Sequence, residues 1–472
     1  MQDLRTQILQ GILNKLSLTL TDDQERALDE FLAFYQSNED RTALLLTGSA
    51  GTGKTFMINI FTQFLRKMGY KVVLLAPTGR AAKVISKRSN RLAYTIHHHI
   101  YHVKENTFGQ VNFFRRSNKE KSKTVYVVDE ASMIGDKGDA AFGQGLLRDL
   151  LDFVFEEDPQ RKLIMVGDPV QLPPVGHKTS PAIDADALAY IGDLEIFDAY
   201  LSEVKRQLVD SGVLGNAVLI RDAYLLGKMK GLELEPGRDV MTLENGYEGL
   251  ETYMGYFREG DLDRVIFITY SNYQAMKVNQ AIRYQLLETQ ELIIESDLLM
   301  VVKNNYAWGD PKKFPFIANG EMGTVRYVAQ ESYEERYGLK WIDAEVEFID
   351  AQAEPILIHC KLMLDLLNNK QPQMNREQMS YILQERRREY DALSPSMLSE
   401  QLRKDPYVNA LQVKYGYAIT GHKSQGGQWE NVIIGFEPDY GNDLSAYTRW
   451  AYTVFTRAEE RVYLLNCPFV SF

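Results

Sequence analysis

Short apolar runs alternate with amphipathic stretches through much of the chain, in a pattern typical of parallel sheets flanked by helices. Between Ala43 and Leu75, an apolar run, a glycine-rich turn, an amphipathic stretch and a second apolar run predict a strand–helix–strand unit. Further β-type runs at Val125–Val128 and Leu163–Val166 each end in an acidic or glycine-containing loop. We therefore expect a doubly wound nucleotide-binding sheet in the first half of the chain.

A second set of strand-like runs follows at Val265–Tyr270, Val432–Ile434 and Val462–Leu465, and it predicts a second α/β domain. A long insert interrupts this domain. The early part of the insert contains an alternating run, Asp343–Phe348, that is typical of a small β-barrel. The later part, Met374–Leu402, is rich in Glu, Arg, Gln and Leu and predicts an exposed helical arm.

The expected fold class is thus α/β, with two parallel-sheet domains and an inserted small β-barrel and helical arm. We place the first domain at residues 1–200, with a short polar and aromatic insert at about 95–123. The second domain takes residues 201–295 and 411–472, and the barrel and arm take residues 296–410. A length of 472 residues, with 45% hydrophobic and 25% charged residues, suits several folded domains in one polypeptide.

Charge and cysteine content narrow the protein class. A net charge of −11 argues against a uniformly basic surface, but it allows phosphate contacts confined to a narrow channel. The two cysteines, Cys360 and Cys467, are too few for a disulfide framework and lack zinc-site spacing, so we expect a reducing cytoplasm. No apolar run is long enough to span a bilayer, which indicates neither export nor membrane insertion.

The segment Gly48-Ser-Ala-Gly-Thr-Gly-Lys-Thr55 matches the phosphate-binding loop pattern, between a predicted strand and a predicted helix. In such a loop, backbone N–H groups surround the phosphates, Lys54 reaches the terminal phosphates and the Thr55 hydroxyl ligates Mg²⁺. A plain glycine-rich turn is the alternative, which the strand and helix on either side disfavour. The expected nucleotide contacts are Gly48, Ser49, Ala50, Gly51, Thr52, Gly53, Lys54 and Thr55.

Two adjacent acids follow an apolar strand in Val127-Val-Asp-Glu-Ala-Ser132. Asp129 is predicted to hold Mg²⁺, directly or through water. Glu130 is predicted to orient and deprotonate the attacking water, which distinguishes hydrolysis from phosphate transfer to a substrate. An acid pair that caps a helix is the alternative reading. The expected cofactors are therefore ATP and Mg²⁺.

These residues resemble the superfamily-one helicases, and within them the RecD-like and phage Dda-like group, over most of the chain. The motifs that carry the resemblance are Thr21–Gln24, Ala76–Ala82, Thr95–His97, Gly167–Pro174, Leu201–Arg206, Tyr417–Gly426 and Tyr452–Arg457. The resemblance implies two RecA-like motor domains and ATP-driven unwinding of DNA with 5′-to-3′ movement along a single strand. It also implies a monomer that acts on single-stranded DNA and duplex junctions in DNA repair or recombination, with repair or replication proteins as partners.

The same resemblance assigns further roles around the nucleotide. Gln24 would read the adenine base, and Gln171 would sense the γ-phosphate and couple it to the grip on the strand. Arg206 and Arg457 would reach the γ-phosphate from the second domain, and Gly426 lies in a motif that contacts the nucleotide. Two positions depart from the family pattern, namely Gln428, where relatives often carry Glu, and Gly421, where an apolar residue is usual.

Nucleic-acid contacts are expected from motifs that face the strand in relatives and from the inserted barrel. These residues are Pro77, Thr78, His97, Asn319, Thr420, His422 and Lys423. In the short insert, Phe108, Phe113 and Phe114, followed by Arg115 and Arg116, suggest a hairpin wedge that splits the duplex. Half-buried packing is the alternative for each of these aromatic side chains.

A metal site at the histidine cluster is not expected. His97, His98 and His99 would alternate between opposite faces of a strand, and His102 brings no carboxylate or cysteine partner.

Three other functions compete with a DNA helicase. An RNA helicase of the same superfamily would differ in how it reads the 2′-hydroxyl. An ATP-regulated subunit of a DNA repair nuclease complex would not need the full hydrolytic set of Lys54, Glu130 and the two arginines. A small-molecule kinase is disfavoured by Glu130 and by the whole second domain.

Overall fold

The protein is seen here as a computed structural model, which describes residues 11–12, 20–105, 111–137, 145–204, 211–309, 314, 317–350, 354–437 and 443–470. The chain divides into two compact units, and each is described by itself. The first unit comprises Met1–Pro77, Ala81–His102 and Phe113–Gly231, and the second comprises Thr78–Arg80, Val103–Asn112 and Leu232–Phe472. None of the described helices is long and apolar enough to cross a membrane.

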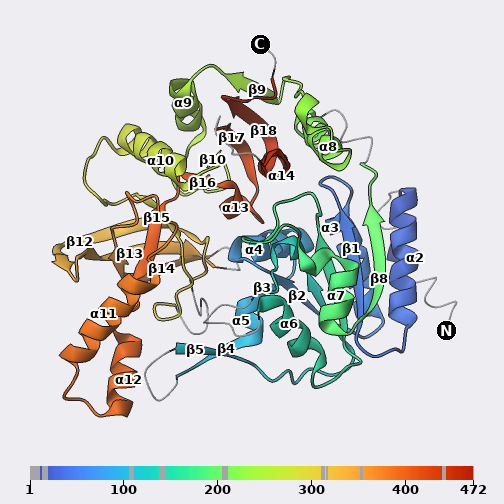
Figure 1. Ribbon diagram of the computed structural model, residues 1–472, viewed down its shortest axis with the longest axis horizontal. Coiled ribbons are helices and arrows are strands. Elements are labelled where there is room, and N and C mark those ends of the chain that lie inside the picture. The colour runs from blue at the N-terminus through green and yellow to red at the C-terminus, as the bar shows by residue number, and fades with distance from the viewer. Residues whose placement is uncertain are drawn as a thin grey trace. The chain divides into compact units, whose positions relative to one another are not determined.

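The first unit is built on a six-stranded sheet whose strands are all parallel, in the order β3-β2-β6-β7-β1-β8 (Figure 1). Its strands are β1 (Thr42–Gly48), β2 (Lys71–Ala76), β3 (Ala93–Thr95), β6 (Thr124–Val128), β7 (Lys162–Gly167) and β8 (Glu195–Leu201). Its helices are α2 (Asp22–Gln36), α3 (Lys54–Lys67), α4 (Gly79–Ser89), α5 (Ile96–Ile100), α6 (Leu146–Phe155), α7 (Ala185–Gly192) and α8 (Gly212–Leu225). The doubly wound sheet predicted from the alternating pattern is confirmed.

Both faces of this sheet are buried, so its strands read as continuous apolar runs. Leu44 and Leu46 pack in one core with side chains of α2, α3 and α4, where Phe31 and Phe61 stack with ring centroids 4.1 Å apart. Leu45, one residue out of phase, packs in the other core with α5, α6 and α7. Successive side chains of a strand point to opposite faces of the sheet, so a single apolar run contributes side chains to both cores.

The second unit contains a five-stranded parallel sheet in the order β16-β10-β17-β18-β9. Its strands are β9 (Val240–Leu243), β10 (Val265–Thr269), β16 (Ala418–Thr420), β17 (Trp429–Gly435) and β18 (Ala458–Leu465). The helices beside it are α9 (Gly246–Tyr256), α10 (Asn272–Leu287), α13 (Gly421–Ser424) and α14 (Leu444–Phe455). The predicted second α/β sheet is therefore confirmed.

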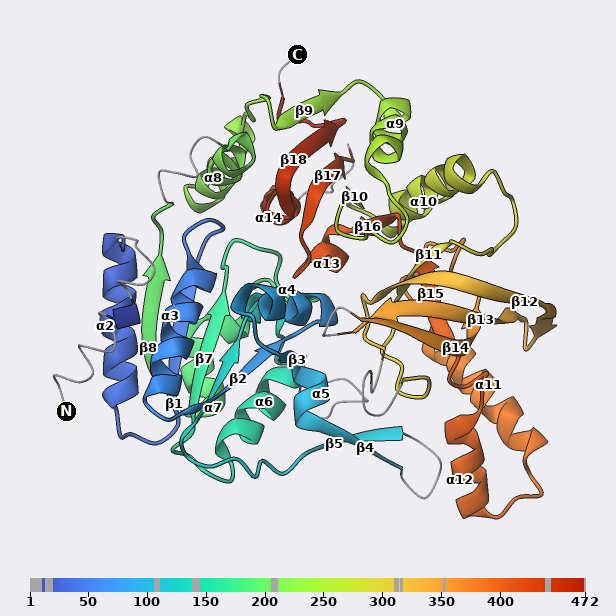
Figure 2. The same cartoon turned by 180° about the vertical axis from the view of Figure 1, so that it is seen from behind.

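A closed five-stranded barrel lies between β10 and β16 in the chain, as we expected for the insert of the second α/β domain (Figure 2). Its strands are β11 (Leu298–Val301), β12 (Met322–Arg336), β13 (Leu339–Ile349), β14 (Pro355–Met363) and β15 (Leu411–Tyr415). The closing strand β15 pairs antiparallel with β11 and parallel with β14, so the barrel extends past the predicted insert of 296–410. One further boundary also differs from our placement at residue 200, because α8 belongs to the first unit, which runs to Gly231.

A buried ion pair fixes the barrel to α10. Nε and Nη2 of Arg283 donate to the two carboxylate oxygens of Asp297 at 2.6 and 2.9 Å, and the side chain of Asp297 is fully buried. Tyr417, which follows the closing strand, accepts the backbone N–H of Leu298 at 3.0 Å through its hydroxyl. The first and last strands of the barrel therefore meet one polar cluster where the insert leaves the sheet domain.

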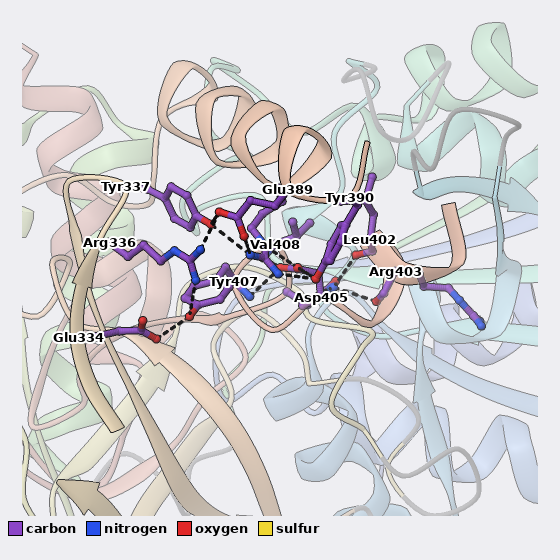
Figure 3. A network of polar contacts seen from close by, with 12 residues as sticks. Glu334, Arg336, Tyr337, Glu389, Tyr390, Leu402, Arg403, Asp405, Tyr407 and Val408 are labelled. Atoms are coloured by element: carbon purple, nitrogen blue, oxygen red, sulfur yellow. Dashed lines mark hydrogen bonds and ion pairs between the residues drawn. The ribbon is translucent and has the colours of Figure 1, made fainter. Parts of the chain in front are cut away.

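The helical arm consists of α11 (Arg376–Glu389) and α12 (Pro395–Lys404), and Figure 3 shows the polar network at its base. Arg386 lies at the centre, where Nε donates to Asp405 Oδ2 at 2.6 Å and the guanidinium also contacts Glu389 and Tyr390. Tyr337, in the turn between β12 and β13, donates to Glu389 Oε1 at 2.6 Å. The arm was predicted to be exposed, but this inner face is fastened to the barrel hairpin.

The short insert of the first domain contains a two-stranded sheet made by β4 (Tyr101–Glu105) and β5 (Val111–Arg115). Phe108 and the side chain of Phe113 lie outside the described residues, whereas Phe114 is 43% exposed. Arg115 pairs with Glu156, and Arg116 Nε donates to the Tyr101 carbonyl at 2.6 Å. The hairpin expected from the sequence is present, and its use as a wedge stays a prediction.

The histidine run is helical, so our expectation of a strand with histidines on opposite faces is wrong. Thr95 caps α5 by accepting the His98 N–H at 3.2 Å, which is a local signal that favours a helical turn. The ring of His99 packs edge-on against Tyr126 and Phe153, with centroids 5.9 and 5.6 Å away. Among the described residues, no group of three or more His, Cys, Asp or Glu side chains is arranged to hold a metal ion.

Burial, followed by the nearby charges of His98 and Arg116, lowers the pKa of His99 from 6.5 to about 4. The unfolded chain then binds more protons than the folded chain between these two values, so folding stability falls as the pH drops from 6.5 to 4. Between pH 6.5 and 4, we expect the free energy of unfolding of His99→Phe to fall by roughly 2–3 kcal/mol less than that of the wild-type protein. Urea unfolding of both proteins at stepped pH would measure it, and an equal stability loss in both would refute it.

Candidate nucleotide-binding site

The loop between β1 and α3 has the backbone that the phosphate-binding pattern requires. Gly51 and Gly53 adopt positive φ angles of 79° and 94°, and Gly53 is the residue that precedes α3. A Cβ atom at Gly53 would lie 2.5 Å from Nε2 of Gln24, so a larger residue would displace that side chain as well as strain the backbone. The predicted order of strand, loop and helix is present.

Lys54 lies inside this loop at the first position of α3. Its ammonium donates to the carbonyl oxygens of Gly48 at 2.7 Å and Ser49 at 2.8 Å. It also lies 4.0 Å from Asp168 Oδ2, on a carboxylate that is almost fully buried. The hydroxyl of Ser49 is buried and has no hydrogen-bond partner within the described part of the chain. The loop thus gathers a cation and polar groups where phosphate oxygens are expected, with Ala50, Thr52 and Thr55 in the same segment.

Asp129 and Glu130 follow β6 at the same edge of the sheet, because the strands are parallel and their carboxyl ends lie together. Burial and the neighbouring charge of Glu130 raise the pKa of Asp129 to about 6. Asp129 Oδ1 accepts the Glu130 N–H at 2.9 Å, and Glu130 itself has a left-handed φ of 54°. A non-glycine residue is held in this conformation at a cost of about 1–3 kcal/mol, a feature that often occurs at functional sites.

The loop after β7 brings in a residue that we had not singled out. Asp168, not only the predicted Gln171, lies at the site, since its carboxylate faces Lys54 and its Oδ1 accepts the Val170 N–H at 3.0 Å. Gln171 follows three residues after Asp168, and it is 5% exposed. The signal for Asp168 was available, because it is the first acid after a strand that neighbours β1 in a parallel sheet.

Gln24 is fully buried and supports the loop. Its Oε1 accepts the Thr21 N–H at 3.3 Å, which completes a capping box at the start of α2. Its Nε2 donates to the Thr52 carbonyl at 3.0 Å. Each polar atom therefore has a protein partner, so reading of adenine by Gln24 stays a prediction that would use its second lone pair and second N–H.

Of the two arginines that we predicted to reach the γ-phosphate, the structure describes only Arg457. Arg206 lies outside the described residues. Arg457 is 3% exposed, and its guanidinium donates to the carbonyls of Thr453 at 3.0 Å and Gly427 at 3.2 Å within the second unit. Contact of Arg457 with a γ-phosphate would require those hydrogen bonds to be exchanged, and the role stays a prediction.

The motif from Tyr417 to Gly426 lies on β16 and α13, with Gly426 buried at a φ of 72°. Gly421, unexplained by the family pattern, packs against the indole of Trp450, because a Cβ there would lie 2.4 Å from Nε1 of that ring. Any larger residue at Gly421 would therefore clash with Trp450. Gln428 is half-buried, and its departure from Glu stays unexplained by its surroundings.

The residues predicted to contact nucleic acid occupy both units. Pro77, which ends the first segment of the first unit, and Thr78, which is assigned to the second unit, follow β2 and are half-buried. His97 of the first unit lies on α5 with its ring centroid 5.8 Å from that of Tyr101. In the second unit, Lys423 donates a hydrogen bond to Asn319 of the inserted barrel. The remaining two are Thr420, which is buried, and His422, which is exposed. The structure brings Asn319 and Lys423 together, although they are far apart in sequence.

Comparisons with known proteins support these motifs. A family model described as an AAA domain matches residues 19–207, and one described as a UvrD-like helicase C-terminal domain matches residues 415–465. The ATP-dependent RecD2 DNA helicase of Deinococcus radiodurans is 30% identical over 156 residues, which are 33% of this chain and 18% of that protein. The ATP-dependent DNA helicase Dda of Enterobacteria phage T4 is 27% identical over 296 residues, 60% of this chain and 61% of that protein.

Among solved structures, a Pif1 helicase from Bacteroides in complex with ADP-AlF3 and single-stranded DNA is 16% identical, with a TM-score of 0.45. That match covers 96% of this chain and 94% of the Pif1 chain. The sequence matches span the phosphate-binding loop in one unit and the Tyr417–Gly426 motif in the other. The chain thus matches an AAA-domain model and a UvrD-like helicase C-terminal model over separate segments, and it is similar in sequence to the RecD2, Dda and Pif1 helicases.

Proposed function

We propose that this chain is an ATP-dependent DNA helicase that moves along single-stranded DNA from 5′ to 3′ and couples ATP hydrolysis to unwinding. The observation that carries the proposal is the grouping of Lys54, Asp168 and the Asp129–Glu130 pair at one edge of the first sheet. A phosphate loop without a general base would suit a binding switch, whereas this set suits hydrolysis.

The residues of the phosphate-binding loop and the acidic pair fit a nucleoside triphosphate with Mg²⁺. The buried hydroxyl of Ser49 has no partner among the described residues and needs a hydrogen-bond acceptor or donor, and burial together with the charge of Glu130 raises the pKa of Asp129, which a bound cation would offset. We assign Mg²⁺ to Thr55 and Asp129, and the triphosphate to the loop amides and Lys54. When bound, the ion neutralises charge on the phosphate oxygens.

The protein's own groups then have separate tasks in this proposal. Glu130, whose backbone has a left-handed φ of 54°, positions the attacking water and accepts its proton. Gln171 reports the presence of the γ-phosphate. Arg206 and Arg457 supply positive charge to that phosphate, which stabilises the charge that develops during hydrolysis.

A strand-displacement assay tests this proposal directly. The substrates are matched DNA duplexes with a 5′ or a 3′ single-stranded tail, together with RNA versions of each. We expect unwinding of the 5′-tailed DNA with ATP and Mg²⁺. Preferential unwinding of RNA would favour the RNA helicase, and ATP hydrolysis without unwinding of any duplex would favour a regulatory subunit of a nuclease complex.

Replacement of Arg457 is expected to separate nucleotide binding from turnover. Arg457→Ala should keep nucleotide affinity within about threefold and lower DNA-stimulated turnover by at least about 100-fold, as for other arginines that stabilise this transition state. Arg461→Ala is the matched control, because the Arg461 side chain on β18 is 41% exposed and pairs only with Glu460 among described carboxylates. Normal turnover in Arg457→Ala would remove this arginine from the mechanism.

A cytoplasmic location and action as a monomer are part of the proposal, as are repair or replication proteins as partners. Cys360 and Cys467 support a reducing compartment, because both are buried free thiols.

A further inference from the structure

A pocket in the second unit lies among α10, β11, β15, β16 and α13. One wall is apolar and includes Met276, Met300, Val302 and Pro372. The polar lining includes two lysines, Lys414 from the closing strand of the barrel and Lys423 from the Tyr417–Gly426 motif. Figure 2 shows these elements grouped where the barrel meets α10. Lys414 had no assigned role from the sequence.

The two ammonium groups that line this pocket have no carboxylate partner among the residues that the structure describes. Lys414 is 9% exposed, and its Nζ donates to the Asn369 carbonyl at 2.6 Å. Lys423 donates to Asn319. Within the described ranges of the chain, neither lysine has a carboxylate oxygen within 4.0 Å. Each ammonium carries three N–H donors, so both retain donors for a ligand.

The charges of the two lysines also favour an anion in this pocket. Burial lowers the pKa of Lys414 to about 8, and burial together with the charge of Lys414 lowers the pKa of Lys423 to about 8. Both groups are then mostly protonated at neutral pH, and they repel each other. An anion between them would relieve the repulsion and restore part of the lost solvation.

The other two lysines that are buried in the described part of the chain, Lys361 and Lys162, are neutralised or fully hydrogen-bonded. Lys361 of the same barrel lies 2.9 Å from Asp343 and 3.4 Å from Glu334. Lys162 of the first unit donates to the carbonyls of Phe34 and Ser37 and to the hydroxyl of Thr42. A structural role therefore accounts for these lysines, but it leaves the charges of Lys414 and Lys423 unbalanced.

We propose that this pocket binds a phosphate group of the nucleic-acid strand, with Lys414 and Lys423 as its ligands and the apolar wall against the adjoining nucleoside. The inference rests on the proposed function, and it adds Lys414 to the residues that grip the strand. The ligand class is a phosphodiester, because a compact anion matches two ammonium groups and the apolar wall suits the nucleoside beside it.

The first test measures binding of fluorescent dT12 by anisotropy across a series of salt concentrations. Lys414→Gln should reduce the slope of log affinity against log salt by about 0.7 and weaken binding roughly threefold to tenfold, as expected for one lost phosphate contact on a single strand. Lys361→Gln is the matched control and should keep the wild-type slope, because its ammonium is neutralised within the barrel.

The outcomes separate this inference from the function on which it rests. If the wild-type protein binds dT12 and Lys414→Gln keeps both its affinity and its salt slope, the pocket does not hold the strand and the inference fails alone. If the wild-type protein does not bind dT12 at any salt concentration, the proposed function fails with it.

A second test needs no variant, so it does not depend on the folding of Lys414→Gln. Lysines of the wild-type protein are acylated with and without dT12, and their modification is read by mass spectrometry. The strand should protect Lys414 and Lys423 but not Lys361, and inorganic phosphate at the same concentration should not protect them. Equal protection by inorganic phosphate would identify a free-anion site, and no protection by either ligand would also overturn the inference.

Discussion

Lys54→Ala is expected to lower the DNA-stimulated ATPase rate by at least about 100-fold, in line with the loss of a charged group that stabilises a transition state. The ammonium of Lys54 is held between the carbonyls of Gly48 and Ser49 and faces Asp168. It is therefore positioned in the loop before any nucleotide arrives, and alanine would leave the phosphates without this cation. Steady-state hydrolysis with saturating single-stranded DNA would measure the effect.

The matched control for this experiment is Lys67→Ala, an exposed lysine at the end of the same helix, α3. It should hydrolyse ATP at the wild-type rate. Thermal unfolding should show that Lys54→Ala is folded, because its ammonium contacts backbone carbonyls of its own loop. Hydrolysis at the wild-type rate by folded Lys54→Ala would contradict the assignment of this loop to the triphosphate.

The second large effect concerns stability at the base of the helical arm. Arg386→Leu is expected to destabilise the packing of α11 and α12 against the barrel by about 3–5 kcal/mol, because it removes one partner of a buried ion pair. Asp405 would be left fully buried, with hydrogen bonds from Tyr390 and from the backbone but without its cation. Glu389, which Figure 3 shows in the same network, would also lose its contact with the Arg386 guanidinium.

Hydrogen exchange would locate this loss. In Arg386→Leu, amides of α11 and α12 should exchange faster by a factor of about 100 or more, while those of the first sheet should be unchanged. The matched control is Arg388→Leu, two residues along the same helix, where the side chain is 74% exposed and pairs with Glu385. That exposed pair should contribute less than about 1 kcal/mol. Equal exchange in the two variants would show that the buried network does not hold the arm.

Much of the fold followed from the sequence because its signals are local. The strands β2, β6 and β7 appear as short apolar runs, and the glycine spacing of the phosphate loop reflects backbone angles within a few residues. The same holds for Asp129 and Glu130, which are fixed by the strand that precedes them. Local signals were also missed, since the cap at Thr95 marks α5 as helical rather than extended.

Other features depend on pairing between distant segments, which no local pattern reports. The barrel is closed by β15, over 40 residues after β14, because its free edges require a partner for their backbone groups. Gln24 supports the phosphate loop through Thr52, and Gly421 is required by Trp450. Each of these contacts joins residues that look unremarkable in their own sequence neighbourhood.

The sequence by itself determined the two parallel sheets, the phosphate loop and the acidic pair, because strand periodicity and backbone geometry act over short stretches of chain. The tertiary structure alone decided which charges are balanced. Arg386 and Lys361 have carboxylate partners brought from other strands and turns, whereas Lys414 and Lys423 line one pocket without such a partner among the described residues. Charge balance is a property of three-dimensional proximity, because Coulomb interactions depend on distance in space and not on separation along the chain.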